Sequence, residues 1–125
     1  MPNDVVDKFL GRAAMTPESP AIITSREVVS YRQFEHRARA FAAAFSNREA
    51  PRVLIALPPG VDVYASIFAA GLVGGFHTPV NMASPLAKMR LIVEQLQPDV
   101  VVSNPDLLSH LRQMMPRTAT IEDRA

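Results

Sequence analysis

The spacing of apolar positions changes about two-fifths of the way along the chain. Before residue 50, two long stretches repeat apolar residues every three or four positions, as amphipathic helices do. After residue 52, short continuous apolar runs alternate with helical patterns, and such runs are typical of strands covered on both faces. The pattern predicts helices over Asp4–Met15, Ser30–Phe45, Val61–Val73, Pro85–Leu96 and Pro105–Met114, and strands over Ala21–Thr24, Glu27–Ser30, Val53–Leu57, Phe76–Val80, Asp99–Ser103 and Thr118–Glu122.

Local signals define the ends of several of these elements. Ser30 and Gln33 have the spacing of a capping box, in which each side chain accepts an amide hydrogen bond near the start of the helix. Ser84 is expected to cap a later helix, with Pro85 at its first position. The predicted buried helix faces are Val5, Val6, Phe9, Leu10 and Ala13; Phe34, Ala38, Phe41, Ala42 and Phe45; Tyr64, Ile67, Phe68 and Leu72; and Leu86, Met89, Ile92, Val93 and Leu96.

The repeated strand–helix–strand unit predicts an α/β fold. We expect a mostly parallel sheet flanked by helices, preceded by an amino-terminal helix and a small β-hairpin. Residues 1–125 are expected to form a single domain. The sequence ends just after a candidate strand with no helix to close the unit, so we interpret it as an incomplete amino-terminal subdomain of a larger α/β protein.

Composition removes several function classes. Thirteen Lys and Arg nearly balance twelve Asp and Glu, so nothing favours nucleic acid or an anionic membrane as a partner. The absence of cysteine excludes disulfides and thiolate chemistry. No targeting segment is visible, and the uncharged stretch 63–76 is too short to span a bilayer. We therefore expect a cytoplasmic protein. A homo-oligomer is left open.

The ionisable residues do not form a recognisable catalytic or metal-binding pattern. The three histidines, His36, His77 and His110, lack the spacing that places two imidazoles on one helical face. Close carboxylate pairs occur only near the ends of the chain, at Asp4 with Asp7 and at Glu122 with Asp123, where capping or solvation explains them. The arginines Arg32, Arg37, Arg39 and Arg48 are interpreted as a solvated helix face.

The glycine-rich stretches also lack a phosphate-binding pattern. Pro58-Pro59-Gly60 lies between a strand and a helix, but its prolines remove two of the amide donors that a phosphate loop uses. Gly71, Gly74 and Gly75 follow a helix, whereas the dinucleotide fingerprint must follow a strand. Both stretches are interpreted as structural turns.

Two segments resemble core motifs of the adenylate-forming (AMP-binding) acyl and aryl acid ligases. The segment 29–34, which contains Ser30 and Tyr31, resembles the first motif, and the helix and strand that contain Gly71, Pro79 and Asn81 resemble the second. The strands at 52–58 and 97–102 are similar to that family in order and spacing. The resemblance covers about residues 3 to 122.

The resemblance implies a reaction in two steps. A carboxylic acid and ATP give an acyl-adenylate and pyrophosphate, and a thiol of CoA or of a carrier protein then takes the acyl group. It also implies magnesium, ATP and CoA for the complete enzyme, with none bound by this chain alone. Its phosphate loop, which ends in Gly-x-Pro-Lys, is absent here. The loop Met82-Ala83-Ser84 offers no base to a CoA phosphate.

We therefore carry over only structural motif positions, Ser30, Tyr31, Gly71, Pro79 and Asn81. We expect no catalytic, cofactor-binding or metal-binding residue in this chain. The expected partner is the remainder of the ligase, covalently joined or on a separate chain. Two alternatives stay open. One is a standalone non-catalytic interaction or regulatory module, or split-enzyme subunit, derived from that family. The other is a small doubly wound domain, unrelated to ligases, that binds a nucleotide or another ligand at the carboxyl ends of its strands.

Overall fold

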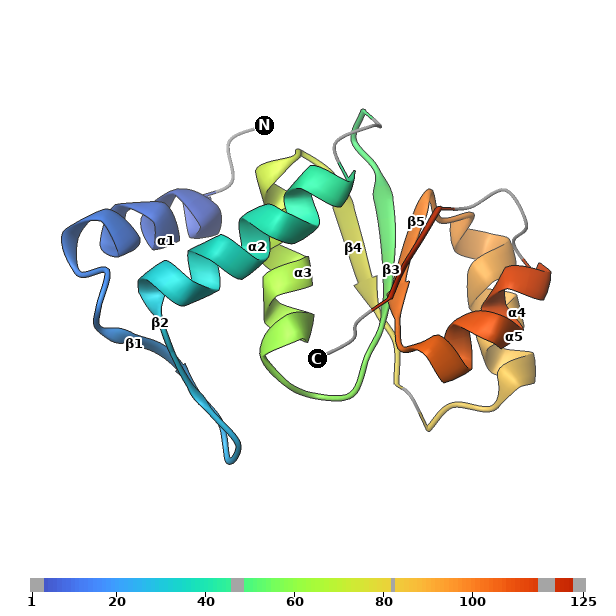
Figure 1. The fold of residues 1–125 in the computed structure, drawn as a ribbon. Helices are drawn as coiled ribbons and strands as arrows, with labels where there is room; N and C mark the ends of the chain where they lie inside the picture. The colour runs from blue at the N-terminus through green and yellow to red at the C-terminus, as the bar shows by residue number, and fades with distance from the viewer. Residues whose placement is uncertain (1–3, 46–48, 82, 115–118, 123–125) are drawn as a thin grey trace.

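A parallel sheet with helices on both faces forms the centre of the molecule, and a helix and a small hairpin lie beside it (Figure 1). The computed structural model describes residues 4–45, 49–81, 83–114 and 119–122. The elements are α1 (Asp4–Met15), β1 (Pro20–Ile23), β2 (Val28–Ser30), α2 (Tyr31–Phe45), β3 (Arg52–Ala56), α3 (Val61–Leu72), β4 (Phe76–Pro79), α4 (Leu86–Leu96), β5 (Val100–Ser103), α5 (Pro105–Met114) and β6 (Ala119–Glu122).

The four strands of the main sheet run in the order β4-β3-β5-β6, and every neighbouring pair is parallel. Each predicted helix and strand is present, with bounds that match or differ by one residue; Thr118 lies outside the described residues. The predicted α/β class is therefore confirmed. The chain leaves β3 through α3 toward β4, crosses back through α4 to β5 on the other side of β3, and continues through α5 to β6.

The continuous apolar strands are buried because both faces of the sheet are covered. Val53, Ile55 and Val102 point to the side of α2 and α3, and Leu54 and Val101 point to the side of α4 and α5. Burying each of these side chains contributes about 1.5–3 kcal/mol, so the alternation of faces along β3 and β5 fixes the sheet between two helical layers. Phe45 and Leu108, both fully buried, close the two layers.

A third cluster joins the amino-terminal helix and the hairpin to this body. The rings of Phe9, Phe34 and Phe68 lie with their centroids 5.1 to 5.3 Å apart, and they come from α1, α2 and α3. Such ring pairs add about 0.5–1.5 kcal/mol beyond the area that they bury. The hairpin, whose β1 and β2 are antiparallel, projects from the rest of the molecule next to α3 (Figure 1).

The turns show which local predictions hold. In the hairpin, the Thr24 hydroxyl accepts hydrogen bonds from the amides of Arg26 and Glu27 at 3.2 and 3.1 Å, which explains a tight turn without glycine. The capping box is confirmed, because the Ser30 amide donates to Gln33 Oε1 at 2.9 Å and the Gln33 amide donates to Ser30 Oγ at 3.2 Å.

Two predictions about helices are wrong. Pro85, not Ser84, is the residue that precedes the first turn of α4, because the helix begins at Leu86, and no side chain caps it. Ser84 lies in the preceding turn, where its amide donates to the Asn81 carbonyl. The second error concerns the buried faces. The side chains of Val5, Tyr64 and Leu86 are exposed. In α3 the buried face consists instead of small residues, because α2 packs closely against it: Val61, Ala65, Ser66, Ala69 and Ala70.

One glycine is required where α3 returns to the sheet. A side-chain carbon at Gly75 would lie closer than 3.0 Å to the carbonyl oxygen of Pro51 and 3.0 Å from two carbons of its ring. Next to it, Gly74 has a φ of 69°, a left-handed conformation that glycine adopts without strain. These two residues allow the Phe76 amide to reach the Pro51 carbonyl at 2.8 Å, which starts the pairing of β4 with β3.

β4 ends the sheet with an edge that is poorly suited to further strand pairing. The amides of Phe76 and Val80 donate to β3, so by alternation the backbone of His77 and Pro79 faces away from it. Proline has no amide hydrogen, and its place on the outer side of an edge strand costs no hydrogen bond inside the sheet. No helix among the described residues combines the length and the apolar character needed to cross a membrane.

Candidate functional site at the carboxyl edge of the sheet

In open α/β sheets, ligands bind outside the carboxyl ends of the strands, where successive connections diverge to opposite sides. Here the connection after β3 leads toward β4 and the connection after β5 leads toward β6, so the point of divergence lies between β3 and β5. The segments that reach this edge are Leu57–Gly60 after β3, Val80 and Asn81 after β4, and Asn104 after β5. This is where chemistry is expected.

The start of α3 does not fit a phosphate group. Pro58 and Pro59 supply no amide hydrogen, and Asp62 places a carboxylate in the first turn of the helix. A carboxylate there interacts favourably with the partial positive charge of the helix terminus and repels an incoming anion. The start of α5 is similar, because Asn104 Oδ1 accepts the Leu107 amide at 2.9 Å and Asp106 lies in the first turn.

A cavity of about 390 Å³ opens between the start of α3 and the end of β4. Its polar side chains are Tyr64 and Asn81, and the rest of its lining is apolar or backbone. Asn81 Oδ1 accepts a hydrogen bond from the Ala83 amide at 2.9 Å, so the side chain also shapes the loop toward α4. The lining residues are Ile55, Leu57, Pro59, Gly60, Val63, Tyr64, Pro79, Val80 and Asn81.

The hydroxyl at the point of divergence is used for structure. Ser103, at the end of β5, is fully buried, and its Oγ donates to the Ala56 carbonyl of β3 at 2.8 Å. A buried hydroxyl that has a hydrogen-bond partner costs little to bury, whereas one without a partner is destabilising. This bond fastens the ends of β3 and β5 together and leaves Ser103 inaccessible as a nucleophile.

The residues carried over from the family motifs lie in two separate places. Ser30 and Tyr31 lie where β2 passes into α2, and the Tyr31 ring packs against Phe9 at a centroid distance of 5.7 Å. Pro79 and Asn81 line the carboxyl-edge cavity. Gly71 lies in the last turn of α3, where its carbonyl accepts the Gly74 amide at 3.2 Å. The structure therefore unites Pro79 with Asn81 but not with Ser30 or Tyr31.

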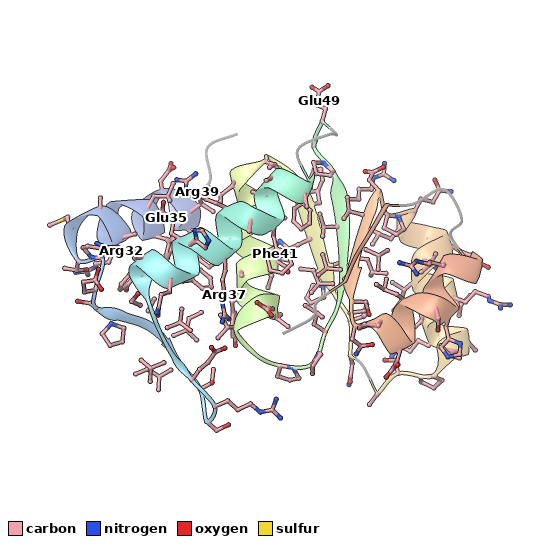
Figure 2. The ribbon with its side chains drawn as sticks, viewed as in Figure 1. Arg32, Glu35, Arg37, Arg39, Phe41 and Glu49 are labelled. Atoms are coloured by element: carbon pink, nitrogen blue, oxygen red, sulfur yellow. The ribbon has the colours of Figure 1, made fainter. Side chains whose placement is uncertain are left out.

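The arginines of α2 are paired with carboxylates (Figure 2). Arg32 contacts Glu18 at 2.8 Å and Arg39 contacts Glu35 at 2.8 Å, both at exposed positions where such pairs contribute about 0–1 kcal/mol. This arrangement agrees with the predicted solvated helix face. Arg48 lies outside the described residues.

Arg37 makes a connection that the sequence pattern did not reveal. Its guanidinium bonds both carboxylate oxygens of Glu27 at 3.2 Å and lies 3.7 Å from Asp62. These three residues come from the hairpin, α2 and α3, so the network joins the hairpin to the body. This network could not be predicted from the sequence, because Glu27 and Asp62 are 10 and 25 residues away from Arg37, beyond the range of helical spacing rules.

The remaining titratable candidates do not converge. The side chains of His36, His77 and His110 are exposed on three different elements. Among the described residues, no group of three His, Asp or Glu is placed to hold a metal ion. The side chains of Asp4, Glu122 and Asp123 lie outside the described residues.

Comparison with known proteins gives a consistent result. The family model for AMP-binding enzymes matches residues 9–124. Enterobactin synthase component F of Escherichia coli (strain K12) is 26% identical over 100 residues, which are 78% of this chain and 8% of that protein. Indigoidine synthase of Dickeya dadantii (strain 3937) is 25% identical over 115 residues, 90% of this chain and 8% of that protein. The chain therefore spans less than a tenth of the length of these relatives.

Solved structures share the fold. A nonribosomal peptide synthetase bound to α-methyl-L-serine-AMP superposes with a TM-score of 0.84 and 20% identity, over 94% of this chain and 14% of that one. The o-succinylbenzoate CoA synthetase of Bacillus subtilis, in complex with its acyl-adenylate intermediate, gives a TM-score of 0.78 and 19% identity, over 91% of this chain and 30% of that one. In each case the likeness extends over nearly all of this chain and a minority of the other.

Proposed function

This chain belongs to the family of AMP-binding enzymes, and we propose that it forms the amino-terminal subdomain of an AMP-forming acid ligase. Such a ligase converts a carboxylic acid and ATP into an acyl-adenylate and pyrophosphate, and then forms a thioester with CoA or with a carrier protein. The observation that carries the proposal is the family match over residues 9–124, together with a fold shared over 94% of the chain with an adenylate-bound peptide synthetase.

The chemistry of the carboxyl edge supports a scaffolding role within that enzyme. The segments that reach this edge present prolines, an apolar cavity and helix starts that already carry Asp62 or Asp106. None of these features fits a triphosphate with its magnesium, whose charge requires amide donors, Lys or Arg. We propose that ATP, magnesium and CoA are bound by the complete enzyme through residues outside this chain, in the cytoplasm.

The proposal specifies the acceptor of the acyl group only as a thiol. The similar solved structures include a nonribosomal peptide synthetase and a CoA synthetase. The described part of the loop after β4 contains no basic residue that could bind a phosphate of CoA. The loop therefore does not favour CoA over the thiol of a carrier protein. Both acceptors remain within the proposal.

The test is an ATP–pyrophosphate exchange assay on the pure chain of 125 residues with a panel of aliphatic, aromatic and amino acids. We expect no exchange above background, and calorimetry is expected to show no heat with ATP, AMP or CoA. Exchange by the chain alone would contradict the proposal. Binding of a nucleotide without exchange would instead favour a small nucleotide-binding domain.

Sequencing of the native reading frame after Ala125 provides an independent test. We expect an in-frame Ser/Thr/Gly-rich stretch that ends in Gly-x-Pro-Lys. A stop codon and a stable monodisperse protein of 125 residues would favour the standalone module.

A further inference from the structure

An open apolar hollow of about 370 Å³ lies between α1, the hairpin and α3. Its floor contains Phe9, Phe34 and Phe68, the three packed rings of the third cluster. Its rim includes Ile23, which is 72% exposed, and Tyr64, which is 51% exposed. Large apolar side chains left in water around a hollow mark an interaction surface more often than scattered single ones do.

Tyr64 lines this hollow and also the carboxyl-edge cavity. The two depressions therefore adjoin at Tyr64 on α3, one towards the hairpin and the other towards the end of β4. Tyr64 and Phe68 are four residues apart on one helical face, which explains how a single helix contributes to both.

The chemistry of the hollow selects the kind of occupant. Its lining has no charged residue, and the Thr24 hydroxyl already bonds the hairpin turn. The nearby Glu27 and Asp62 both contact Arg37. Small-molecule sites need several placed polar groups, and nucleic acid or anionic lipid needs unpaired positive charge. The hollow is instead complementary to an uncharged, apolar face of a folded polypeptide.

We propose that this surface, centred on Ile23 and Tyr64, docks the remainder of the adenylate-forming enzyme, an inference that rests on the proposed function. In the similar solved structures, this fold accounts for 14% and 30% of the chains. The other 70% or more of such an enzyme lies outside this fold, and the part joined to it needs a surface on which to pack. The outer edge of β4 is poorly suited to that contact because it carries Pro79, whereas the hairpin–α3 surface offers apolar side chains without a competing charge.

The experiment measures the chemical accessibility of Tyr64. The chain contains two tyrosines, and Tyr31 is half-buried against Phe9, so it serves as an internal reference. The pure chain is compared with a chimaera in which it replaces the matching 100-residue segment of enterobactin synthase component F of Escherichia coli. Both proteins are nitrated with tetranitromethane, and each tyrosine is followed by peptide mass spectrometry.

We expect nitration of Tyr64 to slow at least tenfold in the chimaera, while nitration of Tyr31 changes less than twofold. Equal nitration of Tyr64 in both proteins overturns the proposal. If the chimaera precipitates, the chain is mixed with the separately purified remainder of that adenylation domain, and unprotected Tyr64 in the mixture overturns the proposal as well.

Charge substitutions provide a second readout. Ile23→Lys is expected to abolish the protection of Tyr64 or lower the soluble yield of the chimaera at least fivefold. Tyr64→Lys, which removes the nitrated residue, is expected to lower the soluble yield at least fivefold. Leu91→Lys is the matched control, because Leu91 is 58% exposed on α4, outside both depressions, and it is expected to change neither quantity. Equal effects of all three substitutions overturn the assignment of the surface.

Self-association is the competing outcome. If sedimentation shows that the pure chain is a dimer, and Ile23→Lys dissociates it while Leu91→Lys does not, the occupant is a second copy and the proposal is wrong. None of these readouts uses ATP or turnover. Protected Tyr64 in a chimaera without exchange activity would therefore contradict only the proposed function, and activity with unprotected Tyr64 would contradict only the docking surface.

Discussion

Substitution of Gly75 by alanine tests why a glycine stands between α3 and β4. The new carbon would lie closer than 3.0 Å to the Pro51 carbonyl oxygen and 3.0 Å from Pro51 Cδ and Cγ. Ordinary contact begins at about 3.4 Å, and both partners are rigid, since one is backbone and the other a proline ring. The strand start must therefore move by roughly one ångström to admit one methyl group.

The expected cost combines two terms. Overpacking in a rigid place costs about 1–3 kcal/mol. The shift also strains the hydrogen bonds of the Gly75 amide to Ala70 and of the Phe76 amide to Pro51, both 2.8 Å long and each contributing about 1 kcal/mol. We expect a loss of about 3 kcal/mol in the free energy of unfolding. For a chain of 125 residues this corresponds to a fall in Tm of about 11 °C.

Urea unfolding followed by circular dichroism at 222 nm measures this loss, because the chain has no tryptophan. Two other glycines serve as controls. Gly74→Ala meets no atom within 4 Å but must hold a φ of 69°, so it is expected to cost about 1–2 kcal/mol from backbone strain alone. Gly11→Ala, in open space inside α1, is expected to stabilise the protein by about 0.5–1 kcal/mol.

The steric argument would be refuted if Gly75→Ala cost no more than Gly74→Ala. It would also fail if the m-value changed with the midpoint, because the loss would then belong to the denatured state. A larger loss for Gly75→Ala than for Gly74→Ala, with Gly11→Ala stabilising, would show that close approach to Pro51 requires this glycine. The glycine at position 75 of the second family motif would then be required by packing rather than by a ligand.

Three further changes test other parts of the fold by the same measurement. Ser30→Ala or Gln33→Ala is expected to lower the free energy of unfolding by about 0.5–2 kcal/mol. The double variant is expected to lose less than the sum of the two single losses, because the two side-chain hydrogen bonds support each other, and additive losses would contradict a reciprocal capping box. Ser103→Ala is expected to lower the free energy of unfolding by about 1–3 kcal/mol, because the Ala56 carbonyl of β3 loses the hydroxyl that bonds it. Ser66→Ala is the control and should be nearly neutral, because the Ser66 hydroxyl bonds only the Asp62 carbonyl of its own helix. Equal losses would contradict the bridge between β3 and β5. Gln97→Gly is expected to stabilise the protein by about 0.5–1 kcal/mol, because Gln97 holds a φ of 49° at the end of α4, and a loss of stability would show that its side chain has a role.

The sequence pattern predicted the sheet well because buried parallel strands have few alternatives. A run such as Val53 to Leu57 must be covered on both faces, and short connections between such runs and helices allow only a parallel sheet of this kind. The helices were equally predictable, since the spacing of apolar residues indicates where each helix begins and ends. The capping box at Ser30 was predictable because both of its partners lie within one turn.

Helix orientation was harder to predict where apolar residues surround the helix. α3 offers two apolar faces, one with Tyr64 and Phe68 and one with Ala65 and Ala69. Size alone favours burying the large side chains. The structure buries the small ones most deeply and leaves Tyr64 exposed, because α2 can approach a face of alanines closely, and that choice depends on a partner 20 or more residues away. The exposed Tyr64, and with it the proposed docking surface, therefore could not be predicted from periodicity.

The positions that carry the family resemblance lie where the backbone changes direction. Ser30 and Tyr31 convert a strand into a helix, Gly71 and the glycines after it convert a helix into a strand, and Pro79 and Asn81 lead from a strand into a loop. Each satisfies a geometric requirement that is independent of any substrate. A chain can therefore retain these positions through the demands of its fold alone, so they identify the family while carrying little information about the acid. Under the proposed function, the choice of acid then depends on residues other than these motif positions.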